Sequence, residues 1–230
     1  MTKIIGIIGG MGPLASVDLQ EKIIKNTRAD IDADHLHVIT DCNTQIPDRT
    51  AAILEGGRDA LPKLVESAKR LERAGAEVIL IACNTAHYYL EDLKKEVGIP
   101  FISLIESSVI TAKKRGIKKL SILSTTASYM MGLYQEVCLD YGIDYLDHDE
   151  DDFQLLMEII YAVKSGDLHR KPQEMRAFLQ KEVARGSEAF ILGCSELPIY
   201  FAHNDMGVEV LDSTLCLARS AIVYAGGQLL

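Results

Sequence analysis

Residues 77–90 read EVILIACNTAHYYL, and residues 188–201 read EAFILGCSELPIYF. In both stretches an acid is followed by an apolar run, a small residue, a cysteine, a polar pair and a segment with aromatic residues. A short, bounded apolar run indicates a buried strand, and the segment after it indicates a helix. Each stretch therefore predicts a strand, a cysteine just beyond the end of that strand, and a helix after the cysteine.

A matching pair of stretches lies upstream of these two. Residues 3–15 read KIIGIIGGMGPLA and residues 119–132 read KLSILSTTASYMMG, and both show a lysine, an apolar strand, a loop of small residues and a helix. The spacing from the first of these loops to Cys83 is nearly the spacing from the second loop to Cys194. The repeated spacing predicts two pseudo-symmetric α/β lobes whose cysteines face each other across the cleft between them.

Short apolar runs alternate with segments of helical period along the whole chain. This alternation predicts parallel sheets with helices on both faces, and nearly all-apolar strands are typical of strands buried on both sides. The expected strands are residues 4–8, 35–40, 78–82, 100–104, 120–123, 189–192 and 208–211. The expected helices are residues 15–29, with Val17, Leu19, Ile23 and Ile24 inward, and residues 59–74, 87–97, 105–115, 128–141, 153–165, 172–185 and 213–224. We assign residues 1–104 plus 212–230 to the first lobe and residues 105–211 to the second.

The composition is that of a globular chain. Of 230 residues, 48% are apolar and 25% are charged, close to the average for soluble domains. No apolar stretch approaches the ~20 residues that span a bilayer, so we expect no membrane segment. The formal net charge of −9 argues against nucleic-acid binding, which needs a basic surface. Five cysteines in a chain large enough to build a core indicate a reducing cytoplasm rather than a disulfide framework.

Cys83 and Cys194 are the candidate reactive residues. Both follow a predicted strand, and the active sites of parallel sheets lie beyond the carboxyl ends of the strands. The N–H groups and dipole of the following helix are expected to lower the pKa of each thiol from ~8.5 toward neutrality. A lone cysteine there is more often a small buried hydrophobe, but the matched positions favour a function for the pair. The other three lie in apolar contexts and are interpreted as core residues: Cys42, Cys138 and Cys216.

Four short motifs stand at the predicted ends of strands: GGMGP at residues 9–13, IPDRT at 46–50, CNTAH at 83–87 and GCSELP at 193–198. Together they resemble the aspartate/glutamate racemase family, and most of all its aspartate racemase branch. The glutamate racemase branch carries Asp-Ser-Gly near its N-terminus and a histidine after its second cysteine–threonine pair, where this chain has Gly9-Gly10-Met11 and Glu196. The resemblance covers essentially the whole chain. It implies a two-lobed, cytoplasmic homodimer that racemises acidic amino acids with two cysteines and neither cofactor nor metal.

The chemistry of racemisation agrees with this resemblance. Two acid/base groups on opposite faces of a planar intermediate can remove the Cα proton from one face and return a proton to the other. Cys83 and Cys194 are expected to be these groups, since a cysteine can be thiol or thiolate near pH 7. The enolate-like intermediate needs fixed hydrogen-bond donors, which Asn84, Thr85 and Ser195 beside the cysteines can supply.

The substrate carboxylates need local cations, because the chain is acidic overall. Arg49 lies in a polar loop, residues 45–50, and its planar fork matches a carboxylate. The family counterpart of Lys164, at a predicted helix end, contacts the side-chain carboxylate of the substrate. The alternative interpretation is structural: Arg49 would be a solvated loop residue, and Lys164 would complement the dipole of its helix. Further substrate contacts are expected from three loops: Met11 and Gly12, Gln45, and Thr125.

Other functions stay open. The spacing Gly10-x-Gly12-x-x-Ala15 after a strand fits a loose dinucleotide-binding fingerprint, although Asp41 lies farther along the chain than the ribose-binding acid usually does. The same cysteines could serve an isomerase or decarboxylase of another small carboxylic acid. The two lobes could also form an amino-acid-binding domain without turnover.

Two further features have a structural interpretation. Residues 144–152 are mostly acidic and are expected to form a solvated turn and a helix cap, since their spacing is not that of a calcium loop. His87 either orients the loop of Cys83 or serves as a capping or packing residue.

Overall fold

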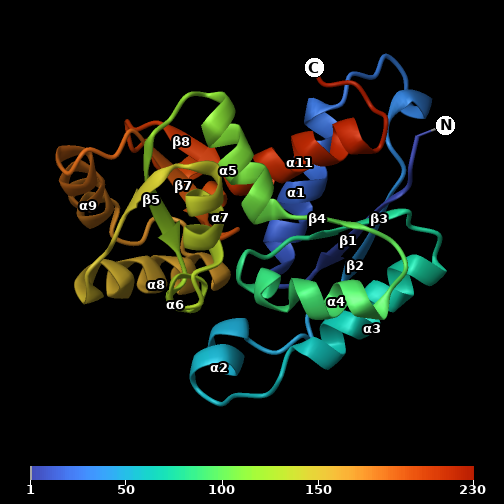
Figure 1. The fold of residues 1–230 in the computed structure, drawn as a ribbon, viewed down its shortest axis with the longest axis horizontal. Coiled ribbons are helices and arrows are strands. Elements are labelled where there is room, and N and C mark those ends of the chain that lie inside the picture. The colour runs from blue at the N-terminus through green and yellow to red at the C-terminus, as the bar shows by residue number, and fades with distance from the viewer. Residues whose placement is uncertain (1) are drawn as a thin grey trace.

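The computed structural model describes residues 2–230, which form two α/β halves with the same strand order (Figure 1). The first sheet has the order β2-β1-β3-β4 and the second the order β6-β5-β7-β8, and neighbouring strands are parallel. The strands are β1 (Ile5–Gly9), β2 (Val38–Cys42), β3 (Val78–Ile81), β4 (Phe101–Ile102), β5 (Lys119–Ser124), β6 (Asp144–Leu146), β7 (Ala189–Gly193) and β8 (Val210–Asp212). The expected pair of parallel sheets flanked by helices is confirmed.

Helices flank both sheets and connect their strands (Figure 1). They are α1 (Pro13–Asn26), α2 (Arg49–Leu54), α3 (Leu61–Arg73), α4 (Leu90–Glu96), α5 (Leu104–Lys114), α6 (Thr126–Met130), α7 (Leu133–Tyr141), α8 (Glu150–Lys164), α9 (Pro172–Ala184), α10 (Leu197–His203) and α11 (Ser213–Tyr224). Two 3₁₀ helices, η1 (Asp32–Asp34) and η2 (Thr85–Tyr89), complete the chain. Among residues 2–230, no helix combines the length and apolar character that a membrane span requires.

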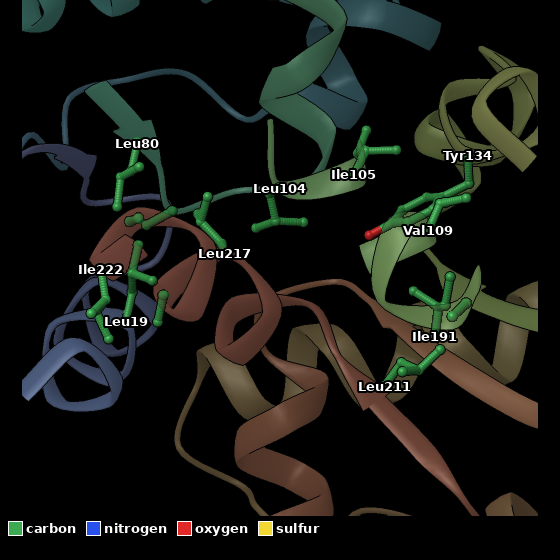
Figure 2. Packing of buried hydrophobic residues seen from close by; sticks show 14 of the residues in the cluster. Leu19, Leu80, Leu104, Ile105, Val109, Tyr134, Ile191, Leu211, Leu217 and Ile222 are labelled. Carbon is green, nitrogen blue, oxygen red and sulfur yellow. The ribbon is translucent and has the colours of Figure 1, made fainter. Parts of the chain in front are cut away.

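One apolar core joins the two halves. Helix α11 packs against both α1 and α5, and α5 packs against α7. Figure 2 shows Leu104 of α5 and Leu217 of α11 in the cluster that also holds Leu80 of the first sheet and Ile191 of the second. These side chains are fully buried, and each such burial contributes about 1.5–3 kcal/mol. The shared core fixes the two sheets relative to each other, while the exact lobe boundaries at residues 104 and 211 stay a prediction.

Two polar segments gain structure that their composition did not indicate. The loop expected at residues 45–50 ends in helix α2, because the Asp48 carboxylate caps its first turn by accepting a hydrogen bond from the Ala51 amide at 2.9 Å. The solvated turn expected at residues 144–152 is wrong at its start, where strand β6 pairs with the edge of β5. The helix cap expected there is confirmed, since the Asp149 carboxylate accepts from the Asp152 amide at 3.0 Å.

Three expectations about local packing are also wrong. Val17 and Ile24 are exposed, because the buried face of α1 follows the i, i+4 spacing of Ala15, Leu19 and Ile23. The helix expected at residues 128–141 breaks into α6 and α7 at Gly132, whose φ of 65° a helix interior does not allow. Cys42 is exposed at the end of the edge strand β2, whereas Cys138 and Cys216 are buried as expected.

Candidate active site

The carboxyl ends of the central strands of both sheets face one narrow pocket. Most of the predicted site residues line it: Met11, Arg49, Cys83, Asn84, Thr85, Thr125, Lys164 and Cys194. This inner pocket has a volume of about 20 Å³, which is room for about one water molecule. An outer pocket of about 250 Å³ adjoins it, shares Met11, Arg49 and Lys164, and is also lined by Gly12. The two matched cysteines are therefore brought together, as the repeated sequence predicted.

Two predicted residues lie outside both pockets. Gln45 is exposed on the loop before α2. Ser195 is buried, and its hydroxyl donates to the carbonyl oxygen of Ala82 at 3.3 Å. The Ser195 hydroxyl thus ties the second cysteine loop to the strand end of the first half, and a substrate contact of either residue stays a prediction.

The loop of Cys83 is held by His87. The Leu104 amide donates to Nε2 of His87 at 3.0 Å, so Nδ1 carries the proton and donates to the carbonyl oxygen of Cys83 at 2.9 Å. This arrangement needs the neutral imidazole, and burial lowers the pKa of His87 to about 4. Of the two roles considered for His87, the structure supports the one that orients the Cys83 loop.

Arg49 lies beside Cys83 as the first residue of α2. Its guanidinium donates to the carbonyl oxygens of Pro47 at 2.9 Å and Met11 at 3.0 Å, and only 8% of the residue is exposed. Burial opposes the charged form, but nearby negative charge, that of Cys83 first, outweighs it and raises the pKa of Arg49. The Nε atom is buried without a hydrogen-bond partner among the described residues. A buried donor of this kind is costly unless a ligand accepts from it.

Polar side chains from both halves meet at the pocket that the two cysteines line. The hydroxyls of Thr85, Thr125 and Ser128 form a triangle with sides of 2.9, 2.9 and 3.0 Å. The Thr85 side chain makes no helix cap, which was its alternative role. Next to it, the Oδ1 atom of Asn84 accepts from the phenol of Tyr134. These contacts hold the site donors in place across the two halves.

The second cysteine has different partners. The Cys194 thiol donates to Oε2 of Glu196 at 3.0 Å, and Oε1 of Glu196 accepts from the Lys164 ammonium at 2.7 Å and from the Gly12 amide at 3.2 Å. Burial, together with the negative charge of Glu196, raises the pKa of the Cys194 thiol well above its ordinary value. The lowered pKa expected for this thiol is therefore wrong, because desolvation and an adjacent carboxylate outweigh the N-terminus of the short helix α10.

Glu196 is the site residue that sequence reasoning missed. In the sequence analysis, Glu196 is named only as a departure from the glutamate racemase pattern. An acid two positions after a cysteine at a strand end is a usable signal for a thiol contact. Its reach to Lys164 on α8 and to Gly12 in the other half depends on the fold.

Both glycine amides of the loop before α1 that the dinucleotide fingerprint would use are already bonded within the chain. The Gly10 amide donates to the Ser16 hydroxyl at 2.8 Å, and the Gly12 amide donates to Glu196. Gly10 has a φ of 89°, and a side chain there would collide with the backbone of Asn43. Its glycines therefore serve the tight turn and the contact to Glu196.

One group in residues 2–230 has the composition of a metal site. It consists of the buried side chains His148, Asp152 and Glu182, whose ligand atoms lie within 4.8 Å of one another. Lys181 donates to both Asp152 oxygens at 2.9 Å, and Arg185 donates to Glu182 at 2.6 Å. These residues line neither pocket of the cysteine site, so the group is separate from the chemistry considered above.

Comparison with known proteins agrees with this geometry. A sequence model of the family described as Asp/Glu/Hydantoin racemase matches residues 8–221. The structure is similar to Picrophilus torridus aspartate racemase, with 33% identity, a TM-score of 0.87, and coverage of 99% of this chain and 96% of that one. It is also similar to an aspartate racemase homologue from Pyrococcus horikoshii, with 29% identity, a TM-score of 0.77, and coverage of 98% and 100%. The broad specificity amino-acid racemase RacX of Bacillus subtilis is 27% identical over 95% of this chain and 96% of its own length.

Proposed function

Because the chain belongs to the Asp/Glu/Hydantoin racemase family, and is thus an isomerase of the amino-acid racemase type, we propose that it interconverts L- and D-aspartate with Cys83 and Cys194 as the two acid/base residues. One observation carries the proposal: cysteines from matched strand ends of the two halves line one pocket together with Arg49 and Lys164. An acidic amino acid has two carboxylates, so its racemisation is served by two cations that bind them and by two acid/base groups that act at Cα.

In one direction Cys83 removes the Cα proton as a thiolate, and the Cys194 thiol donates a proton to the opposite face. The Arg49 guanidinium lies beside Cys83, and the Glu196 carboxylate accepts a hydrogen bond from the Cys194 thiol. In the other direction the two roles reverse. The hydroxyls of Thr85 and Thr125 line the same pocket and can donate to the enolate-like oxygens.

Arg49 and Lys164 supply the charge that binds the substrate. The unpartnered Nε of Arg49 and its planar fork suit a carboxylate. Lys164 at the end of α8 donates to Glu196 at 2.7 Å and lines both pockets. We assign the substrate carboxylates to these two cations, with further contacts from the Met11–Gly12 loop.

A deuterium experiment tests the proposal. Single enantiomers of aspartate are incubated with the protein in deuterium oxide, and the Cα position of both enantiomers is followed by NMR and chiral chromatography. In a two-base mechanism, the product enantiomer carries deuterium while the recovered substrate initially keeps its proton. Exchange into the recovered substrate at the rate of inversion would indicate a single base. Release of carbon dioxide would indicate a decarboxylase, and absence of any exchange would indicate a binding protein.

A broad-specificity amino-acid racemase is the second candidate. The pocket cations Arg49 and Lys164 are matched in number by the acids Asp48 and Glu196, and the outer pocket also has apolar lining from Leu14, Ile46, Val163 and Ile199. A nearly neutral pocket with apolar walls admits neutral side chains as well as acidic ones. A panel of enantiomers of aspartate, glutamate, alanine and serine distinguishes the two candidates by the ratio of kcat/KM values.

A further inference from the structure

The Glu196 carboxylate joins three groups that come from different parts of the site. It accepts the Cys194 thiol at 3.0 Å, the Lys164 ammonium at 2.7 Å and the Gly12 amide of the other half at 3.2 Å. Its side chain is only 4% exposed. An ionised carboxylate is that strongly buried only where donors offset the lost hydration, and here all three neighbours are donors.

This arrangement determines that Cys194 carries its proton. A thiolate has no proton to donate, so the short contact to Glu196 requires the thiol form. The two charged groups nearest the Cys194 sulfur oppose each other: Glu196 disfavours a second anion, whereas Lys164 favours one but is already paired with Glu196 at 2.7 Å. The contact to Glu196 therefore holds Cys194 as the proton donor.

Glu196 and Lys164 also lie at the boundary of the narrow inner pocket. Its volume of about 20 Å³ is far below that of an amino acid. Lys164 and Glu196 line both the inner and the outer pocket, so their ion pair lies where the two pockets adjoin. A substrate carboxylate that binds Lys164 must compete with Glu196 for the ammonium.

We propose that Glu196 is a positioning residue that holds the proton of Cys194 and yields Lys164 to the side-chain carboxylate of an acidic substrate. The inference rests on the proposed function for the identity of the substrate, and it goes beyond that function by coupling substrate recognition to the acid of the reaction. An acidic substrate replaces Glu196 at Lys164, while Glu196 keeps its contact with the thiol. A neutral substrate leaves the ion pair closed.

The test is Glu196→Gln, which keeps the shape and the amide acceptor for Gly12 but removes the charge. For aspartate, KM should fall by up to about tenfold, because Lys164 loses its internal competitor. At the same time kcat should fall at least about tenfold, because the thiol loses the acceptor that holds it. For alanine, KM should not change. A residue needed only for folding would not lower KM for one class of substrate.

A second measurement does not depend on activity. The ultraviolet absorbance of the Cys194 thiolate is titrated in Cys83→Ala and in Cys83→Ala/Glu196→Gln, with Cys83→Ala/Cys194→Ala subtracted. The thiolate should appear at lower pH when Glu196 is neutral. Asp48→Asn in the Cys83→Ala background is the matched control, since it removes an acid from the same pockets, asparagine still caps α2, and the titration should not move.

The outcomes distinguish the role of Glu196 from the proposed racemase function. An unchanged thiolate titration in Glu196→Gln overturns the role of Glu196 at Cys194, and an unchanged or raised KM for aspartate overturns the competition for Lys164. If the wild-type chain racemises no acidic amino acid, the proposed function and the competition for Lys164 fail together. A shifted titration would then support only the contact between Glu196 and the Cys194 thiol.

Discussion

The two cysteine loops occupy equivalent places in the two halves, but their side chains differ. After Cys83 come Asn84, Thr85 and, at the fourth position, His87, whereas after Cys194 come Ser195, Glu196 and Pro198. The first loop has a neutral hydroxyl where the second has a buried carboxylate, and the cation beside Cys83 is Arg49. The repeated backbone arrangement thus places two thiols at equivalent positions, while the side chains around them differ in charge and in hydrogen-bond partners.

This difference between the two loops cannot appear in the ratio of kcat/KM for L-aspartate to kcat/KM for D-aspartate. The enantiomers have equal free energies in water, so kcat/KM must be equal for both whatever the side chains do. The difference between the loops can show only in kcat and KM taken separately, in pH profiles and in isotope patterns. The predictions below use these observables.

Removal of either thiol should have the largest effect on turnover. Cys83→Ala and Cys194→Ala should each lower net racemisation by at least ~10²–10⁴-fold, since each thiol serves one face of the intermediate. Cys42→Ala, which removes an exposed thiol, should not change the rate. Chiral chromatography of aspartate measures the loss, and a wild-type rate in either active-site variant would remove that cysteine from the mechanism.

Replacement of Arg49 should have the next largest effect. Arg49→Ala should lower kcat/KM for aspartate by roughly 10- to 150-fold, the value of a charge-assisted hydrogen bond. Arg49→Lys should recover little, because an ammonium cannot reproduce the fork that binds Pro47, Met11 and a carboxylate. Steady-state kinetics with circular dichroism as the folding control measures this effect. Full recovery by lysine would mean that Arg49 acts only as a charge.

Replacement of Lys164 should affect acidic substrates selectively. Lys164→Met keeps the apolar stem but leaves Glu196 without its cation. We expect KM to rise by about tenfold for aspartate and much less for alanine or serine. An equal rise for all substrates would contradict the assignment of Lys164 to the side-chain carboxylate and favour broad specificity.

Replacement of His87 should have the smallest effect on turnover near neutral pH. Its effect is expected on the pH dependence of stability. Its neutral imidazole is required in the fold, with a pKa of about 4 against an ordinary value of 6.5. The unfolded chain therefore takes up a proton that the folded chain does not, and the stability present above pH 6.5 is lost as the pH falls toward 4. The loss amounts to about 3 kcal/mol.

Thermal unfolding measured from about pH 7 down to about pH 4, a range that spans the two pKa values, follows this loss of stability. His87→Gln keeps one donor and one acceptor and should flatten the pH dependence. His203→Gln, at an exposed histidine, should leave the dependence as it is. An unchanged slope in His87→Gln would show that other groups cause the acid sensitivity.

The sequence by itself determined the two parallel sheets and the pairing of Cys83 with Cys194, because apolar runs, glycines and the repeated spacing are local signals. The family resemblance also pointed to Arg49 and Lys164 as candidate cations, and both line the pocket of the two cysteines. Only the tertiary structure decided how the two thiols differ. Glu196 contacts Lys164, Cys194 and Gly12, which lie on three separate segments. Burial, followed by the charge of Glu196, raises the pKa of Cys194 against the local trend of a helix N-terminus. Desolvation and charge pairing depend on which segments meet in space, and that information lies in no single stretch of the chain.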